Sequence, residues 1–265
     1  MLYVVDLLTM LMTGRRIAEI ELAFLPMKTE EYTQIEPAAA QNLILIFPFF
    51  VMCVFLLPLY YMVTKLAEEK ESRAREGMQM MGLRHETYFF AWFIFLFVIV
   101  TIMSGLFVLT GSLQVFRQSN SLFIFVMCVL YGMTMYGFSF IIVATFPSKK
   151  SSATAASLIH LLTYYFGIAF AGQPKTFLTK FIVMLIPNAN LCFMLEHLCN
   201  CEFLGGGLTA EFAKMPVHSV TFYEGLFMLA FDVVVLGLLG YYLDCVMPKE
   251  FGVAKPWNFP CLYLT

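Results

Sequence analysis

The side chains best suited to chemistry lie in one short stretch, residues 196–202, whose acidic, imidazole and thiol groups are all ligand types that zinc accepts. They are Glu196, His197, Cys199, Cys201 and Glu202. These residues are too close in sequence to surround an ion without a second contributing strand, so we predict no metal site. A disulfide involving Cys199 or Cys201 is the favoured alternative, and its partner could lie in an extracellular domain beyond this sequence.

Nucleotide chemistry is the second class to consider. A P-loop requires the pattern G-x-x-x-x-G-K-[ST], whose backbone amides and lysine hold the phosphates, and no Gly-Lys pair occurs in this sequence. We therefore expect no ATP hydrolysis by this chain alone, and we predict no catalytic and no cofactor-binding residues in it. The run Gly205–Gly207 is interpreted as a linker, because no strand pattern precedes it and no lysine follows.

Two ionisable residues lie inside apolar segments. Asp232 is costly there, by about 2.5–3.5 kcal/mol on insertion scales, so we expect a polar partner or a wet cavity beside it. A contact in a transport pathway or between two transmembrane halves and a structural hydrogen bond are both open for Asp232. For His160 a structural role is favoured, because a neutral imidazole is cheaper to bury.

Composition sets the environment in which all these residues must be placed. Of the 265 residues, 60% are hydrophobic and only 13% are charged, with a mean hydropathy of +0.80. Such a chain is too apolar for a soluble domain, and its net charge of −2 offers no basic face for nucleic acid. We predict an all-α, polytopic helical membrane protein.

The apolar segments predict about five membrane spans, because a helix needs about 20 apolar residues to cross a bilayer. The spans fall at about 39–64, 88–112, 119–146, 153–172 and 222–246. Residues of about 176–203 predict a re-entrant hairpin from the outer face, which turns at Pro187-Asn188 and contains Glu196. Its two apolar runs are each too short to cross, and the turn should be sheltered by the spans.

Basic residues predict the orientation, because cytoplasmic loops retain Lys and Arg. One set of short connections carries Lys65, Lys70, Arg73, Arg75, Arg84, Lys149 and Lys150, and the tail carries Lys249 and Lys255. The opposing short loop carries only Arg117. We therefore expect the tail, 247–265, in the cytosol and residues 1–38 outside.

The block Lys65–Trp92 joins two spans and is dense in charge. Glu69 precedes Arg73, and Glu71 precedes Arg75, at the i,i+4 spacing that favours ion pairs on a helix surface. We expect an amphipathic helix at the membrane surface that breaks at Gly82. It could only set topology, or it could couple the spans to a cytosolic partner.

The sequence KLAEEKESRAREGMQMMGL, followed by an aromatic-rich span, resembles the first cytosolic region in transmembrane domains of the A subfamily of ABC transporters. FPSKKSSATAAS resembles the second cytosolic turn of that family, and LIPNANLCFMLEHL resembles its re-entrant hairpin. The tail carries the strongest likeness, in Asp232, Tyr242–Asp244, Val246, Pro248, Glu250–Val253 and Lys255–Pro260. The resemblance covers about residues 40–261. It makes 1–38 the remnant of an extracytoplasmic domain and 247–265 a linker toward an ATPase domain.

The resemblance implies transport of lipids or similar amphiphiles, powered by ATP and Mg²⁺ on a nucleotide-binding domain and completed by a second transmembrane half. It implies coupling residues in the two cytosolic turns: Arg73, Arg75, Glu76, Met80, Met81, Gly82, Leu83, Ser148 and Lys149. It places the protein in the plasma membrane or an endomembrane, such as a lysosome-like compartment or vesicle. The alternative is an ATP-independent scramblase or channel, or a truncated regulatory partner of a full-length transporter.

Overall fold

A computed structural model describes residues 37–170, 176–203, 206–217 and 220–247. The predicted extracytoplasmic remnant, 1–38, and the predicted cytosolic linker, 247–265, lie outside these residues except for Pro37, Ala38 and Met247. The description below concerns the helical unit that begins at Ala38.

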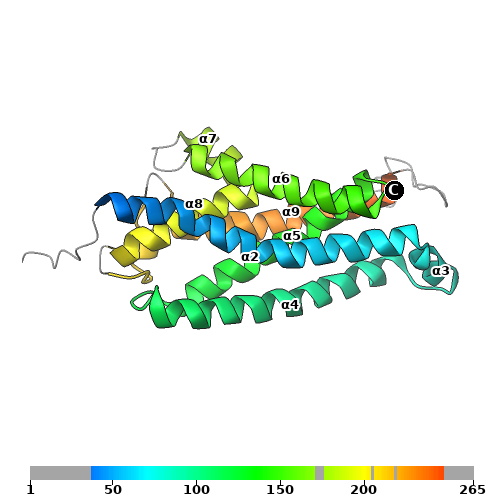
Figure 1. The fold of residues 1–265 in the computed structure, drawn as a ribbon, viewed down its shortest axis with the longest axis horizontal. Coiled ribbons are helices and arrows are strands. Elements are labelled where there is room, and N and C mark those ends of the chain that lie inside the picture. Colours follow the sequence, from blue (N-terminus) through cyan, green and yellow to red (C-terminus); the bar gives the residue numbers. More distant parts are fainter. Residues whose placement is uncertain (1–36, 171–175, 204–205, 218–219, 248–265) are drawn as a thin grey trace, which may run out of the picture. The chain divides into compact units, whose positions relative to one another are not determined.

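Every regular element among the described residues is a helix, which confirms the predicted all-α class. The long helices are α2 (Pro37–Glu71), α4 (His85–Gln114), α5 (Ser121–Thr145), α6 (Lys149–Phe170) and α9 (Phe222–Val246). The short ones are α3 (Ala74–Met80), α7 (Phe177–Met184), α8 (Pro187–Phe203) and the 3-10 turn η2 (Phe212–Lys214). The five long helices are apolar and long enough to cross a membrane, which confirms the predicted polytopic architecture. Figure 1 shows them running lengthwise through the molecule.

Helix α2 is longer than the span predicted at 39–64. It runs without a break through Pro48 and Pro58 and continues through the charged residues as far as Glu71. The charged end stays helical because it contains good helix formers and an ion pair at i,i+3 between Lys65 and Glu68, with 3.2 Å between Nζ and Oε2. The helix break therefore falls at Ser72 and Arg73, ahead of α3, as well as at the predicted Gly82.

Helices α7 and α8 meet at a bend of 108° across Leu185 and Ile186. Pro187 is the first residue of α8, the position where proline costs no hydrogen bond because that amide has no helical acceptor. The turn is covered by other helices, and Asn188 is only 4% exposed. That this helix pair enters the membrane from the outer face stays a prediction.

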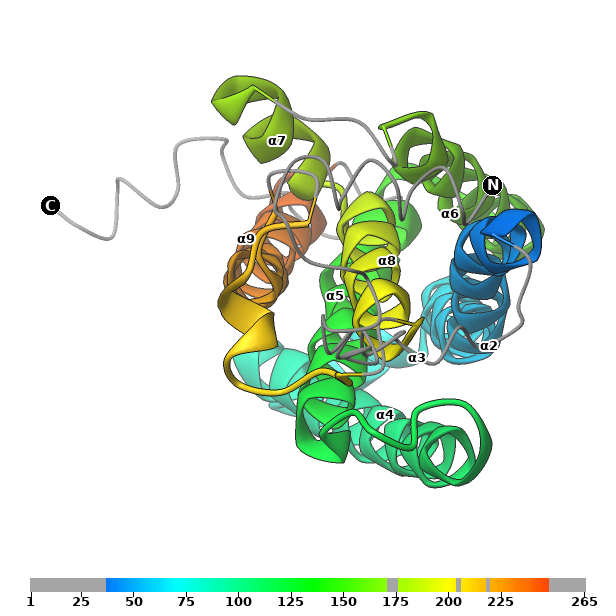
Figure 2. The ribbon, with the colours of Figure 1, turned by 90° about the vertical axis from the view of Figure 1, so that its left-hand side faces the viewer.

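Helix α5 is the central element, with 72% of its apolar window buried, compared with 17% for α4. The end-on view places α5 among the other long helices, with α8 at the near end (Figure 2). Its closest neighbour is α9: a Cβ on Gly137 would lie 2.2 Å from the Leu236 carbonyl carbon. Such close backbone approach through small residues is typical of helix pairs in membranes.

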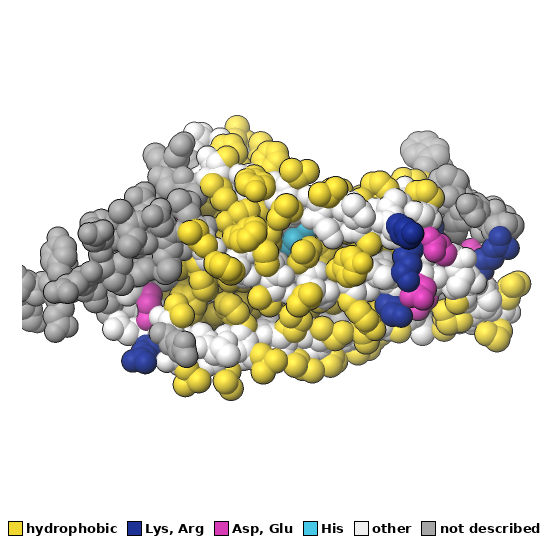
Figure 3. Space-filling model, viewed as in Figure 1, with side chains coloured by type: hydrophobic (Ala, Val, Ile, Leu, Met, Phe, Trp, Pro, Cys, Tyr) yellow, Lys and Arg dark blue, Asp and Glu magenta, His cyan; other side chains and the backbone are white. Residues whose placement is uncertain are grey.

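The surface of the long helices is apolar between charged ends. Large exposed side chains follow α4, among them Ile102, Leu106 and Leu109, each about 60% exposed. Figure 3 shows apolar side chains over the middle of one face and charged side chains gathered toward the end that holds α3. This distribution suits a lipid environment, and the chain is an integral, multi-pass membrane protein.

Candidate functional site

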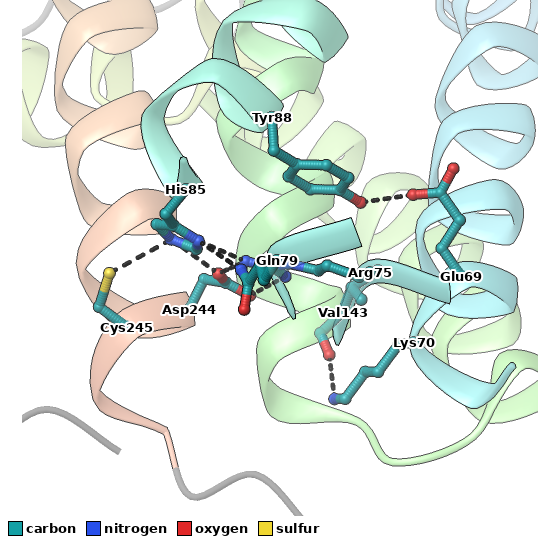
Figure 4. A network of polar contacts seen from close by, with 9 residues as sticks. All are labelled: Glu69, Lys70, Arg75, Gln79, His85, Tyr88, Val143, Asp244 and Cys245. Carbon is teal, nitrogen blue, oxygen red and sulfur yellow. Dashed lines mark hydrogen bonds and ion pairs between the residues drawn. The ribbon is translucent and has the colours of Figure 1, made fainter. Parts of the chain in front are cut away.

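A polar network lies at the α3 end of the helices and gathers side chains from α2, α3, α4 and α9 together with carbonyl groups of α5 (Figure 4). Its side chains are Glu69, Lys70, Arg75, Gln79, His85, Tyr88, Asp244 and Cys245. Here a bidentate ion pair, an imidazole and a tyrosine ring come together from three helices, so this network is the candidate functional site.

The centre of the network is a bidentate ion pair between Arg75 of α3 and Asp244 in the last turn of α9. The Arg75 Nη1 donates to Asp244 Oδ1 over 2.8 Å, and Nη2 donates to Oδ2. The Arg75 side chain is 12% exposed and that of Asp244 is 8% exposed. Because water reaches neither charge well, each is stabilised mainly by the other. Burial by itself lowers the pKa of the Arg75 guanidinium, but the hydrogen bond and charge of Asp244 outweigh it and raise that pKa above its usual value. Arg75 therefore remains charged.

His85, the first residue of α4, lies against both members of this pair. Its Nδ1 is 3.0 Å from Arg75 Nη2, and its Nε2 is 3.3 Å from Asp244 Oδ2. Arg75 can only donate, so Nδ1 of His85 must accept its hydrogen bond. In a neutral ring the proton then lies on Nε2, which faces the carboxylate of Asp244. The imidazole thus connects α4 to the ion pair between α3 and α9.

Arg75 also lies over the ring of Tyr88, with 4.7 Å from Cζ to the ring centroid, and Tyr88 donates its hydroxyl to Glu69 over 2.6 Å. The predicted i,i+4 pair of Glu71 with Arg75 is wrong. The helical spacing that it requires is lost because Arg73, between α2 and α3, has a φ of 57°. Arg73 itself is exposed at this break.

The two predicted cytosolic turns contact each other beside this network. Glu71 accepts a hydrogen bond from the backbone N–H of Lys149, at the start of α6, where a carboxylate also offsets the helix dipole. The Lys149 Nζ lies 3.3 Å from Glu68 Oε2. Ser148 precedes α6, and its hydroxyl accepts from the backbone N–H of Ser151 over 3.3 Å.

Lys70 extends the same contact surface to α5. Its Nζ donates to the carbonyl oxygens of Val143, over 2.6 Å, and Phe146, over 3.1 Å. The last carbonyl groups of a helix receive no hydrogen bond from an amide within that helix. A lysine that donates to them therefore stabilises the end of the helix. The charged end of α2 is thereby bound to the ends of both α5 and α6.

The remaining predicted coupling residues lie in α3 and in the three residues that follow it. Glu76 lies in the first turn of α3. Met80 and Met81 are 86% and 82% exposed, whereas Leu83 packs against the main core. Gly82 has a φ of 98° and ends α3, a conformation that glycine adopts without strain. Their coupling roles stay predictions.

A second polar group lies inside the helices and joins two residues that the sequence suggested separately. Asn188 Nδ2 donates to the carbonyl oxygen of His160 over 2.8 Å and lies 3.2 Å from its Nδ1. The same amide donates to Thr163 Oγ1 over 2.6 Å, and the Asn188 carbonyl oxygen accepts from Tyr131 over 2.5 Å. This group ties the hairpin to α5 and α6.

Asp232 is 1% exposed, and its Oδ2 has no hydrogen-bond partner among the residues that the structure describes. We expected a polar partner or a wet cavity beside Asp232, and no polar partner for Oδ2 is found among these residues. Glu196, the third residue singled out in the hairpin, lies in α8 and is 8% exposed.

The residues of the 196–202 stretch do not converge on one point. Cys201 Sγ lies 3.4 Å from His197 Nδ1, whereas Glu202 accepts a hydrogen bond from Ser119 over 2.5 Å. Cys199 and Cys201 are buried free thiols, so the favoured disulfide is not formed within the described part of the chain.

Asp244 is the important site residue that the sequence did not single out. It appeared only as part of the tail motif. The available signal was its position as a lone carboxylate at the end of a span, on the side where most of the basic residues were expected. Lys70 was counted for topology only, although it donates to the carbonyl oxygens of Val143 in α5 and of Phe146 directly after α5.

Comparison with known proteins identifies the family to which the chain belongs. Residues 6–242 match the family described as ABC-2 family transporter protein. The chain is 27% identical to ATP-binding cassette sub-family A member 13 of Homo sapiens over 239 residues, which is 81% of this chain and 4% of that protein. It is 28% identical to the retinal-specific phospholipid-transporting ATPase ABCA4 of Mus musculus (80% of this chain, 10% of that protein) and to the cholesterol transporter ABCA5 of Rattus norvegicus (74% and 12%).

The chain thus spans a small part of the length of the curated relatives that it matches. The chain itself has five helices that are long and apolar enough to span a membrane, as the resemblance to a transmembrane domain implied. Since the family match extends over most of its length, the chain belongs to the ABC-2 family of transporter proteins and is a membrane domain of the ABC sub-family A type.

Proposed function

We propose that this membrane domain moves lipids or similar amphiphiles, driven by ATP on a nucleotide-binding domain, and that α3 passes the motion of that domain to the spans. The printed names of two relatives, a phospholipid-transporting ATPase and a cholesterol transporter, support a lipid substrate. ATP and Mg²⁺ belong on the nucleotide-binding domain, because the Gly-Lys pair of a P-loop is absent from this sequence. A second transmembrane half would complete the transporter.

The observation that carries this proposal is the connection of α3 to α9 by the Arg75–Asp244 ion pair. A bidentate pair with little exposure resists bending and separation, because either charge alone would be left poorly solvated. A displacement of α3 would therefore pull on the end of α9, which packs along the central helix α5.

The exposed surface of α3 is suited to contact the nucleotide-binding domain whose motion it would receive. Met80 and Met81 are almost fully exposed at the end of this short helix. Flexible, polarizable methionine side chains adapt well to a protein partner. The contacts of Glu71 and Lys149 would bring the second cytosolic turn into the same movement.

The test separates ATP hydrolysis from lipid movement in proteoliposomes that contain the native transporter. Arg75→Gln and Asp244→Asn should each lower ATP-dependent transport of a fluorescent phospholipid by at least about tenfold, since breaking one partner of such a pair costs about 3–5 kcal/mol. Nucleotide hydrolysis should fall much less. The double exchange Arg75→Asp with Asp244→Arg should recover part of the transport, because it restores opposite charges across the same contact.

Arg84→Gln is the matched control, because Arg84 is an exposed arginine in the same connection, and its side chain makes no hydrogen bond or ion pair among the described residues. It should leave transport unchanged. Transport at the normal rate in both single variants, with each correctly folded, would refute the role of the ion pair. Lipid movement that persists without nucleotide would instead favour the scramblase alternative.

A further inference from the structure

A cavity of about 360 Å³ opens between α4, α5 and α9 close to the polar network. It is lined by Glu86, Phe89, Phe90, Phe93, Tyr136 and Tyr241. It is open on one side, so it would cover one face of a small group. Five of its six lining residues are aromatic, and the sixth carries a carboxylate.

The rings are held in place by contacts with one another and with the backbone. Phe89 meets Tyr241 edge to face, with centroids 5.0 Å apart, and Phe93 meets Tyr136 in the same way at 5.4 Å. Tyr136 also donates its hydroxyl to the carbonyl oxygen of Phe89 over 2.9 Å. The aromatic walls are therefore formed before any ligand arrives, which lowers the entropic cost of binding.

Glu86 makes this aromatic cavity electrically negative at its rim. Its carboxylate is exposed in the first turn of α4 and makes no hydrogen bond or ion pair within the described part of the chain. Of the neighbouring basic side chains, Arg75 and His85 face Asp244, and the exposed Arg84 makes no ion pair among the described residues. A ligand in the cavity would thus meet the negative faces of the rings and an uncompensated carboxylate.

We propose that this cavity binds a small organic ammonium group, quaternary as in choline. Aromatic faces attract such cations through the ring quadrupole, and the attraction grows when water is excluded. A bare metal ion would require several oxygen ligands, whereas the cavity supplies one carboxylate. An anionic head group would be repelled by Glu86. This binding does not depend on coupling to ATP.

The cavity borders the charged end of the helices, beside the polar network. Tyr241 is one turn before Asp244 on α9, and Glu86 follows His85, so both belong to the charged end of the helices. Interfacial aromatic residues are typical of the head-group region. The ammonium group could therefore come from a choline-headed lipid or from a free organic cation.

The test uses the full chain in nanodiscs of phosphatidylglycerol and measures equilibrium binding of radiolabelled lysophosphatidylcholine, with lysophosphatidylglycerol for comparison. We expect the choline lipid to bind more tightly. Glu86→Gln and Phe90→Leu should each weaken its binding by about 3- to 10-fold, the range for one cation–π or partly exposed ionic contact. Both side chains are exposed, so neither change should disturb folding.

The controls are Glu211→Gln, an exposed carboxylate away from this cavity, and Phe97→Leu, an exposed phenylalanine farther along α4. Both should bind the choline lipid normally. Competition by tetramethylammonium would support the proposal and identify a free cation as sufficient. Choline-lipid binding without such competition would support it with a lipid head group as the source. Equal binding of the two lysolipids, or binding indifferent to Glu86→Gln, would overturn it.

Discussion

Replacing Gly137 by alanine should separate α5 from α9 and destabilise the domain. The added Cβ would lie 2.2 Å from the carbonyl carbon of Leu236 and 2.4 Å from the amide nitrogen of Gly237. Unstrained carbon contacts lie at about 3.5–4.0 Å, so the shortfall exceeds about 1 Å. Both close atoms belong to the backbone of α9 and cannot rotate away, so the helices themselves must move.

The magnitude follows from two opposing effects. Overpacking in a close-packed interior costs about 1–3 kcal/mol, and we take the upper end because the clash is with backbone. Alanine is favoured over glycine within a helix by about 1 kcal/mol. The net expectation is a loss of about 2 kcal/mol in the free energy of unfolding.

Gly105→Ala is the matched control, because a Cβ on Gly105, in α4, meets nothing within 4 Å. Only the helix preference acts there, so this variant should gain about 0.5–1 kcal/mol. The assay is reversible denaturation of the purified chain in mixed micelles, followed by far-ultraviolet circular dichroism. If Gly137→Ala were as stable as Gly105→Ala, the close packing of α5 on α9 would be refuted.

Two further predictions concern the buried polar groups. Tyr131→Phe leaves the carbonyl oxygen of Asn188 without its donor and should lower the free energy of unfolding by about 1–3 kcal/mol; unchanged denaturation would mean that this hydrogen bond is not formed. Asp232→Leu removes a buried carboxylate oxygen without a partner among the described residues, and it should raise stability by about 1–3 kcal/mol. If this variant is more stable but no longer transports lipid, Asp232 has a functional role; if it is less stable, Asp232 has a structural partner.

The charged block between the first two spans breaks at a position that its local sequence pattern did not predict, Arg73. The spacing of Glu71 and Arg75 favoured a continuous surface helix, yet the chain breaks at Arg73. The local pair is worth only a few tenths of a kcal/mol on an exposed helix surface. The bidentate pair with Asp244 is shielded from water, so the tertiary contact determines the conformation.

The sequence by itself determined the all-α class and five long apolar helices, and it predicted a turn at Pro187-Asn188 that the structure places just before, across Leu185 and Ile186. In a bilayer every backbone amide and carbonyl must be paired within the chain, so a run of about 20 apolar residues has essentially one solution, the helix. The two turns predicted to be cytosolic and the tail also resembled the family closely enough to indicate it, and the family match over residues 6–242 confirms it.

Only the tertiary structure decided which helix faces meet. Lipid tails are as apolar as a protein core, so the faces that touch lipid and those that touch other helices have similar compositions, and periodicity does not distinguish them. For the same reason the sequence did not indicate that Asp244 meets Arg75, 169 positions away, or that Asn188 joins His160 and Tyr131. Those contacts depend on how the helices pack.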